Sequence, residues 1–224
     1  GNRCRQCFIS RDGYKLVGFD ASGLELRMLA HYMNDQEYTN EILNGDIHTA
    51  NQGLAGLESR DQAKTFIYAL LYGAGDAKLG SVAGGGAKLG GELKQRFMSN
   101  LPAFATLRDN TAREATSGVI KGLDGRVLHI RSEHSALNTL LQSAGAIVMK
   151  KALQLLEEYG RLHSLDYYFV GNIHDEVQAE VRAGQEDSYG RLAVSCLEAA
   201  GSFYSLNCPL TGEYKVGESW AETH

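Results

Sequence analysis

The chain has 224 residues, of which 43% are hydrophobic, enough to bury the core of one large domain or two small ones. No stretch has the pattern of a signal peptide and no apolar run reaches the length of a membrane span, so we expect no membrane partner. The sequence begins at Gly1 and not at Met, and we expect it to be a piece of a longer protein.

The formal net charge is −5, which taken alone argues against a nucleic-acid partner. The charge is unevenly distributed, however. Residues 60–131 carry eleven lysines and arginines against six acidic residues, whereas the remainder of the chain carries eleven against twenty-one. A basic middle segment in an acidic chain indicates either an anion-binding face or a pair of solvated basic helices.

The four cysteines are expected to be free thiols, as is usual for an intracellular chain. Cys4 and Cys7 form a C-x-x-C pair, but Cys196 and Cys208 are too far apart to form a second one. Half of the usual ligand pattern disfavours a zinc site.

A short apolar run at residues 14–20 is typical of a buried strand, and apolar residues at helical spacing follow over residues 26–33. Ser22 and Glu25 form a capping box at the start of that helix. Asp20 therefore lies where a strand ends and a helix begins. There it is either a catalytic carboxylate held by the strand or a turn residue that accepts hydrogen bonds from helix N–H groups.

The polar residues 34–45 are interpreted as a boundary, and Asp46-Ile47-His48-Thr49 begins another helical stretch. His48 is either an ordinary surface residue or a donor to a phosphate.

The stretch from Ser59 to Gly75 is expected to be a helix, because Ser59 and Gln62 form a capping box and glycines end the pattern. Its apolar stripe comprises Ala63, Phe66, Ile67 and Leu70. Off the stripe, four residues spaced by four form a ladder roughly 18 Å long: Arg60, Lys64, Tyr68 and Tyr72. Two cations followed by two aromatic rings suit a nucleoside triphosphate; the alternative is a solvated face with two half-buried tyrosines.

The glycine-rich segment 73–91 is interpreted as a flexible loop. It lacks the G-K-S or G-K-T ending of a Walker loop, and a helix precedes it where the dinucleotide-binding fingerprint requires a strand. Residues 91–118 then have the pattern of an amphipathic helix broken by Pro102.

Residues 121–126 predict a turn, residues 126–131 a short strand and residues 135–159 a long helix. Asn138 and Gln142 stand four residues apart on one side of this helix. They are either exposed polar residues or donors to the minor-groove acceptors that all four base pairs share, which would test the shape of a pair without reading its sequence.

Two β-type runs within residues 167–181 enclose His174-Asp175-Glu176, and the second run alternates as a half-buried strand does. Adjacent acids at a hairpin tip are costly unless they are solvated or bound to a cation. An amphipathic helix over residues 186–204 and a short tail with the single tryptophan, Trp220, complete the chain.

Distant stretches thus carry complementary chemistry. Asp20 and Asp175 are expected at strand ends, and Arg60 and Lys64 on a basic helix face. Phosphoryl transfer depends on positioning and charge neutralisation. Two carboxylates from different strands could hold two metal ions that activate a hydroxyl and stabilise a leaving pyrophosphate. These residues predict a metal-dependent enzyme that acts on a nucleoside triphosphate.

Several motifs, in one order over nearly the whole chain, resemble those of family A DNA polymerases. DASGLELRMLAH resembles the first polymerase motif, RDQAKTFIYALLYGAG the fingers helix and HDEVQ the third motif. KGLDGR and ALNTLLQSAGA resemble the palm segments between them, and DIHT the start of the fingers. The replicative polymerases of short-tailed bacteriophages share the longest of these stretches almost letter for letter.

The resemblance implies two Mg²⁺ ions bound by Asp20 and Asp175, with the backbone carbonyl of Ala21 as a further ligand. Glu176 is implied to support them, and Lys64 to act beside them in catalysis. The residues implied to grip the triphosphate are His48, Arg60 and Lys64.

Further roles follow from the same resemblance. Glu25 should exclude a ribose 2′-OH, Tyr68 should lie against the deoxyribose and base, and Tyr72 should stack near the templating base. The residues implied to contact primer–template DNA are Arg126, Asn138, Gln142 and, at the primer terminus, His174.

The implied fold is α+β: a polymerase palm, an antiparallel sheet backed by helices, in residues 1–36 and 119–224, with a helical fingers insertion in residues 37–118. The implied function is template-directed addition of deoxynucleotides to a primer 3′-OH, with release of pyrophosphate, during phage DNA replication in the host cytoplasm. The implied partners are primer–template DNA and deoxynucleoside triphosphates.

The family's thumb would precede Gly1, as would any proofreading exonuclease. In the phage members the thumb carries the binding site of a processivity factor, and the activity of the isolated chain depends on whether it needs that thumb. Two alternatives stay open. A single-subunit RNA polymerase is opposed by Glu25, and a non-catalytic DNA-binding fragment has no need of Asp20 and Asp175 together.

Overall fold

The computed structural model describes residues 2–224 and divides the chain into two compact units. Unit 1 comprises Gly1–Glu25 and Ala144–His224, and unit 2 comprises Leu26–Ser143. Within the described residues, no helix is both long and apolar enough to cross a membrane.

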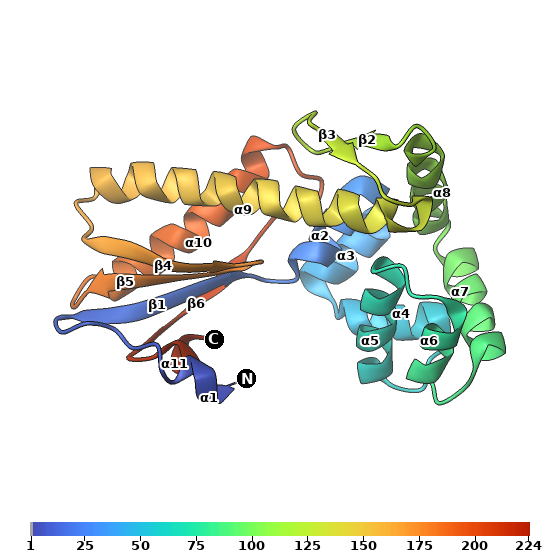
Figure 1. Cartoon of the computed structure of the whole chain (residues 1–224), viewed down its shortest axis with the longest axis horizontal. Coiled ribbons are helices and arrows are strands. Elements are labelled where there is room, and N and C mark those ends of the chain that lie inside the picture. The colour runs from blue at the N-terminus through green and yellow to red at the C-terminus, as the bar shows by residue number, and fades with distance from the viewer. Residues whose placement is uncertain (1) are drawn as a thin grey trace. The chain divides into compact units, whose positions relative to one another are not determined.

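Unit 1 contains a four-stranded antiparallel sheet with the strand order β4–β5–β1–β6 (Figure 1). The strands are β1 (Tyr14–Ala21), β4 (Tyr167–Ile173), β5 (Glu176–Arg182) and β6 (Gly212–Gly217). Alternation along β1 and β5 places apolar residues on one face, where they are at most 2% exposed: Val17, Phe19, Ala21, Val177, Ala179 and Val181. The prediction of an antiparallel sheet with helices is confirmed.

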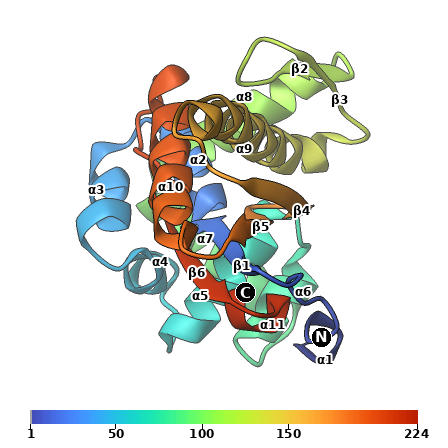
Figure 2. The ribbon, with the colours of Figure 1, turned by 90° about the vertical axis from the view of Figure 1, so that its left-hand side faces the viewer.

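Two helices cover this apolar face, α10 (Glu186–Phe203) and the part of α9 (Ala136–Leu162) that belongs to unit 1 (Figure 1 and Figure 2). Gly190 lets α10 approach the sheet closely, because a Cβ atom there would lie 2.2 Å from the ring of Tyr214 on β6. The buried side chains that α10 contributes include Ala193, Cys196, Leu197 and Ala200.

The opposite face of the sheet carries the two ends of the chain, α1 (Asn2–Arg5) and α11 (Trp220–Thr223). A Cβ atom on Gly18 would lie 2.6 Å from the carbonyl oxygen of Thr223, so α11 rests directly on β1. Two expectations are therefore wrong. The segment around Trp220 is not a simple tail, since it forms β6 and α11. The first half of β5 is buried on both faces, because α11 also covers Glu176 and Gln178, whereas Arg182 at its end is exposed.

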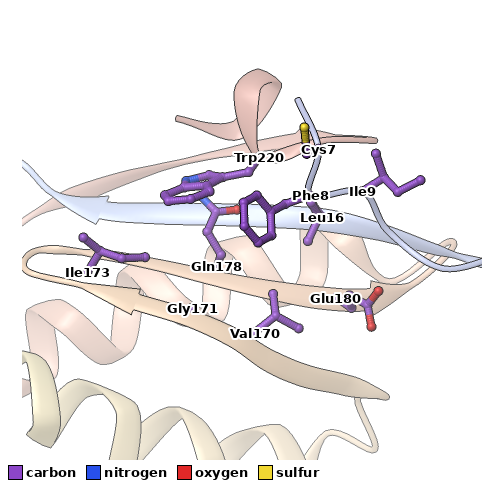
Figure 3. A pocket seen from close by; sticks show the side chains of 10 residues that line it. All are labelled: Cys7, Phe8, Ile9, Leu16, Val170, Gly171, Ile173, Gln178, Glu180 and Trp220. Carbon is purple, nitrogen blue, oxygen red and sulfur yellow. The ribbon is translucent and has the colours of Figure 1, made fainter. Parts of the chain in front are cut away.

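Beside α11 the same face holds a mainly apolar cavity of about 300 Å³ (Figure 3). Phe8 and Trp220 pack edge to face with ring centroids 5.5 Å apart on one side of it, and Val170 and Ile173 of the edge strand β4 line the other. None of the residues predicted to form the functional site lines this cavity.

Unit 2 is mainly helical. Its helices are α2 (Leu24–Met33, of which the first two residues belong to unit 1), α3 (Gln36–Asn44), α4 (Ile47–Ala55), α5 (Arg60–Leu71), α6 (Asp76–Val82), α7 (Ala87–Asn100) and α8 (Pro102–Ala115). A hairpin of β2 (Val119–Lys121) and β3 (Val127–His129), the short helix η1 (Glu133–Ser135) and the start of α9 follow. Phe66, Phe97 and Phe104 are fully buried and pack edge to face, with successive centroids 6.0 and 5.3 Å apart.

Several predictions of local structure are confirmed. The capping box of Ser59 and Gln62 is present at the start of α5, and the stripe from Ala63 to Leu70 is buried. The helix ends at Leu71, before the predicted end, because Gly73 adopts a φ of +76° and turns the chain. The cysteines are free, with Cys4 and Cys7 exposed and the other two buried.

Two segments of unit 2 differ from the prediction. The polar stretch 34–45 contains α3, which begins because the side chain of Asp35 accepts a hydrogen bond from the N–H of Tyr38. The glycine-rich segment 73–91 contains α6 and the start of α7, so the prediction of a flexible loop is wrong. A Cβ atom on Gly80 would lie 2.0 Å from the carbonyl oxygen of Gly86, and one on Gly90 would lie 1.8 Å from that of Asp76. The glycines at these two positions therefore allow α6 and α7 to pack closely.

Candidate active site

Two predicted carboxylates meet at the end of β1. Asp20 is the penultimate residue of that strand, and Asp175 lies in the turn between β4 and β5. The backbone N–H of Ala21 donates to the carbonyl oxygen of Asp175 at 3.1 Å, which fixes the turn against the strand end. The side chain of Asp20 is half-buried and that of Asp175 is exposed. Two residues that are far apart in the sequence therefore lie close together at one end of the sheet.

Further acidic side chains flank Asp20. It pairs across the sheet with Glu176 on β5 and with Glu213 on β6. Burial raises the pKa of Asp20, and the negative charges of Glu213 and Asp175 raise it further, while Lys215 opposes them. Converging carboxylates of this kind are stabilised when a cation binds between them.

The donor set has the character of a magnesium site. No group of three or more His, Cys, Asp or Glu side chains in the described part of the chain is arranged to hold a metal ion. Mg²⁺ does not require one, since it commonly binds through one or two carboxylates and completes its shell with water and substrate phosphates. The oxygens of Asp20 and Asp175 therefore fit this ion.

His174 precedes Asp175 in the same two-residue turn. Its φ of +58° lies in the left-handed region, which is uncommon for a residue other than glycine. The side chain is exposed, so the turn presents an imidazole at the end of the hairpin, next to Asp175 in the chain.

Glu176 differs from its neighbours because its carboxylate is buried and fully engaged. One oxygen accepts hydrogen bonds from Trp220 Nε1 at 2.5 Å and Gln178 Nε2 at 2.7 Å, and the other contacts His224 Nδ1 at 2.5 Å. Burial alone would raise the pKa of Glu176, but these three contacts outweigh it and hold the pKa below its usual value. The C-terminal residues thus hold Glu176 in place, which is compatible with the supporting role expected for it.

The predicted ladder lies on the exposed face of α5 in unit 2. Arg60 and Lys64 are exposed, Tyr68 is half-buried and Tyr72 is 54% exposed. Tyr72, the last of the four residues, lies just after the end of α5 and is its C-cap. Lys64 makes no hydrogen bond or ion pair within the described structure, which leaves its ammonium group available to an anion.

His48 lies in the first turn of α4, near this ladder. Its ring centroid is 6.2 Å from that of Tyr68. Burial lowers the pKa of His48, and the charges of Arg60 and Lys64 lower it further, so the imidazole is neutral at pH 7. Its Nδ1 atom is buried without a hydrogen-bond partner among the residues described.

Arg60 is held by an acidic residue that the sequence analysis did not single out. Asp46 Oδ2 accepts a hydrogen bond from Arg60 Nε at 2.6 Å. The signal that could have found Asp46 was its place directly before the helical stretch Ile47-His48-Thr49, which is typical of an N-cap. No comparable local signal links Trp220 and His224 to Glu176, since only tertiary structure brings them together.

The predicted DNA-contacting residues of unit 2 lie on two elements. On α9, Gln142 is exposed and its Nε2 donates to Tyr72 Oη at 3.4 Å, and Asn138 Oδ1 is buried with no partner among the described atoms. In the β2–β3 turn, Arg126 is exposed and forms an ion pair with Asp124 at 2.7 Å. Glu25, in unit 1, is half-buried in the first turn of α2.

Comparison with known proteins gives a consistent result. The family model described as DNA polymerase family A matches residues 1–222. The DNA-directed DNA polymerase of Enterobacteria phage T3 is 43% identical and that of Escherichia phage T7 is 42% identical, each over 100% of this chain. DNA polymerase I of Pseudomonas aeruginosa is 28% identical, also over 100% of this chain, which covers 27% of its length. The chain spans 36% of the length of the two phage relatives.

The fold is also found among solved structures. The POL domain of Pol1 from M. smegmatis, in complex with a DNA primer-template and dNTP, matches with a TM-score of 0.89. The match covers 99% of this chain and 42% of that one at 21% sequence identity. The α+β fold of this chain is therefore the fold of a polymerase domain.

Proposed function

The chain belongs to DNA polymerase family A, and from this premise we propose that it forms part of an enzyme that adds deoxynucleotides to a primer 3′-OH, as a template directs, and releases pyrophosphate. The observation that carries the proposal is the meeting of Asp20 and Asp175 at the end of β1. The names of the phage relatives support phage DNA replication as the setting. Because the chain spans 36% of their length, the activity is proposed for the full-length protein.

Neither alternative is favoured. A single-subunit RNA polymerase is opposed by the family match and by Glu25, whose carboxylate is proposed to reject a ribose 2′-OH. A non-catalytic DNA-binding fragment would leave the convergence of Asp20 and Asp175 without a purpose.

The enzymes of this family depend on metal ions, and two Mg²⁺ ions fit the donor set of unit 1. The carboxylates of Asp20 and Asp175 and the carbonyl of Ala21 would hold them, and the bound ions would supply activation of the primer hydroxyl and neutralisation of the leaving pyrophosphate. Glu176 supports the site by keeping the end of β5 fixed, since both of its oxygens are already engaged. His174 is proposed to approach the primer terminus.

The triphosphate is proposed to bind along the exposed face of α5. Arg60 and Lys64 bind phosphate oxygens, and the imidazole of His48 donates a hydrogen bond to them. Lys64 also neutralises charge that develops during phosphoryl transfer. Tyr68 lies against the deoxyribose and base, and Tyr72 lies near the templating base.

Primer–template DNA is the second proposed partner. Asn138 and Gln142 are proposed to contact minor-groove acceptors, and Arg126 is proposed to contact the primer–template. Residues 1–36 and 119–224 are proposed to form the palm, and residues 37–118 the fingers. A processivity factor would bind the thumb of the full-length protein, and the enzyme would act in the cytoplasm of the host cell.

The proposal is tested by primer extension with the full-length protein. A labelled primer annealed to four templates that differ in the first unpaired base is expected to gain only the complementary deoxynucleotide, and only in the presence of Mg²⁺. A ribonucleotide is expected to be incorporated at least 100-fold less efficiently. Addition that ignores the template, or equal use of ribonucleotides, would contradict the proposal.

Replacing Lys64 with alanine is expected to raise the KM for deoxynucleotides about tenfold, because a charge-assisted contact to phosphate is worth about 1.5–3 kcal/mol. The dissociation constant for duplex DNA should stay within twofold. Steady-state primer extension and DNA-binding anisotropy measure the two quantities. The reverse pattern would mean that this face of α5 contacts DNA. Lys88 to alanine, on α7, is the matched control and should change neither quantity.

A further inference from the structure

One carboxylate in unit 2 connects two elements that the proposed function assigns to the triphosphate. Asp46 is the N-cap of α4: its Oδ1 accepts from the backbone N–H groups of His48 at 3.0 Å and Thr49 at 3.4 Å, and its Oδ2 accepts from the hydroxyl of Thr49 at 3.1 Å. The same Oδ2 accepts from Arg60 Nε, at the first residue of α5, at 2.6 Å. Asp46 therefore joins the beginnings of two helices.

The geometry of the Arg60 contact matters because the guanidinium has five N–H donors. Asp46 uses the Nε donor, and among the described residues neither Nη atom donates a hydrogen bond. The Nη atoms therefore remain available, and the planar fork of arginine suits two oxygens of one phosphate. An acid bound to both Nη atoms would compete with phosphate, whereas an acid bound to Nε orients the fork.

The contact to His48 has a parallel effect. The hydrogen bond from its backbone N–H fixes the first turn of α4, and with it the direction in which the imidazole leaves the helix. Asp46 is ionised at neutral pH, because the bond from Arg60 and the contacts to Thr49 and His48 hold its pKa well below the usual range. The negative charge that orients Arg60 is thus present at neutral pH.

We propose that Asp46 is a positioning residue of the triphosphate site, which sets Arg60 and the His48-bearing turn in their binding arrangement before a nucleotide arrives. The inference rests on the proposed function, which places Arg60 and His48 on the triphosphate. Its physical basis is preorganisation: a side chain that is already held loses less freedom when the ligand binds.

The test is the Asp46→Asn variant of the full-length protein. Asparagine caps helices as well as aspartate does, so α4 should keep its start. It lacks the charge that holds the guanidinium, so the dissociation constant for a fluorescent deoxynucleoside triphosphate with Mg²⁺, measured by anisotropy without DNA, should rise about five- to tenfold. The KM for deoxynucleotides should rise equally, while kcat stays within twofold and the melting temperature within about 2 °C.

The matched control is Asp61→Asn. Asp61 is the next residue after Arg60, is exposed in the first turn of α5, and no hydrogen bond joins its carboxylate to Arg60 in the described structure. The variant loses the same charge one residue away from Arg60. Triphosphate binding should therefore change less than twofold.

A double-variant cycle shows whether Asp46 acts through Arg60. In the Arg60→Ala background, adding Asp46→Asn should weaken triphosphate binding less than twofold. The inference is overturned if Asp46→Asn weakens triphosphate binding as much in the Arg60→Ala background as in the unaltered protein. It is also overturned if the Asp46→Asn variant alone binds the triphosphate as tightly as the unaltered protein. In both cases Arg60→Ala would still weaken binding, as the proposed function requires. If the unaltered protein binds no triphosphate, the proposed function and the inference both fail.

Discussion

Replacement of Asp175 by alanine is expected to lower primer extension by roughly 10³-fold or more, because Asp175 is one of the two carboxylates proposed to hold the metal ions. Asp20 and Asp175 are the two carboxylates proposed as metal ligands, whereas both oxygens of Glu176 are already engaged. Removing one of them takes away half of the proposed carboxylate ligands. A bound metal ion contributes several kcal/mol to phosphoryl transfer, and each 1.36 kcal/mol corresponds to a factor of ten in rate.

The protein should still fold, since the Asp175 side chain is exposed and only its backbone carbonyl holds Ala21. Single-nucleotide extension by the full-length protein measures the loss, and circular dichroism measures the fold. Asp12 to alanine is the control, because Asp12 is an exposed acid of the same unit that lies before β1. Extension by the Asp175 variant at a rate near that of the unaltered protein would end the enzyme proposal.

Local patterns were reliable wherever neighbouring residues decide the structure. The capping box at Ser59, the buried stripe on α5 and the strand that ends at Asp20 depend on residues within a few positions of one another. The turn that contains Asp175 was predicted for the same reason. These elements supplied most of the candidate site.

What sequence patterns did not reveal depends on long-range contacts. Burial of Glu176 and Gln178 requires α11 to cross the sheet, which no pattern in β5 indicates. The ion pair of Arg60 with Asp46 joins two helix starts that lie fourteen residues apart. The motif resemblance implies that Arg60 binds the triphosphate, but it does not indicate which residue orients the guanidinium.

The glycine-rich segment illustrates the same limit. Glycine indicates flexibility when nothing surrounds it, but it also permits two backbones to approach. In residues 73–91 the second reason applies, since Gly80 and Gly90 lie at the contact between α6 and α7. Only the structure distinguishes the two cases.

Changing Gly90 to alanine is therefore expected to lower the free energy of unfolding by about 3 kcal/mol, the upper range for overpacking a well-packed contact. The added Cβ atom would lie 1.8 Å from the carbonyl oxygen of Asp76 and 2.6 Å from the backbone nitrogen of Gly80. Both are backbone atoms, so relief requires α6 and α7 to separate.

Gly91 offers a matched control one residue further along α7. A Cβ atom there would meet nothing closer than the Asp76 side chain at 3.5 Å, an ordinary contact. Alanine is the better helix former by about 0.5–1 kcal/mol, so Gly91 to alanine should be neutral or stabilising. Urea unfolding of both variants, followed by circular dichroism, measures the difference. Equal stability of the two would mean that these glycines permit flexibility and that α6 and α7 are not closely packed, because close packing is the only feature that separates the two positions.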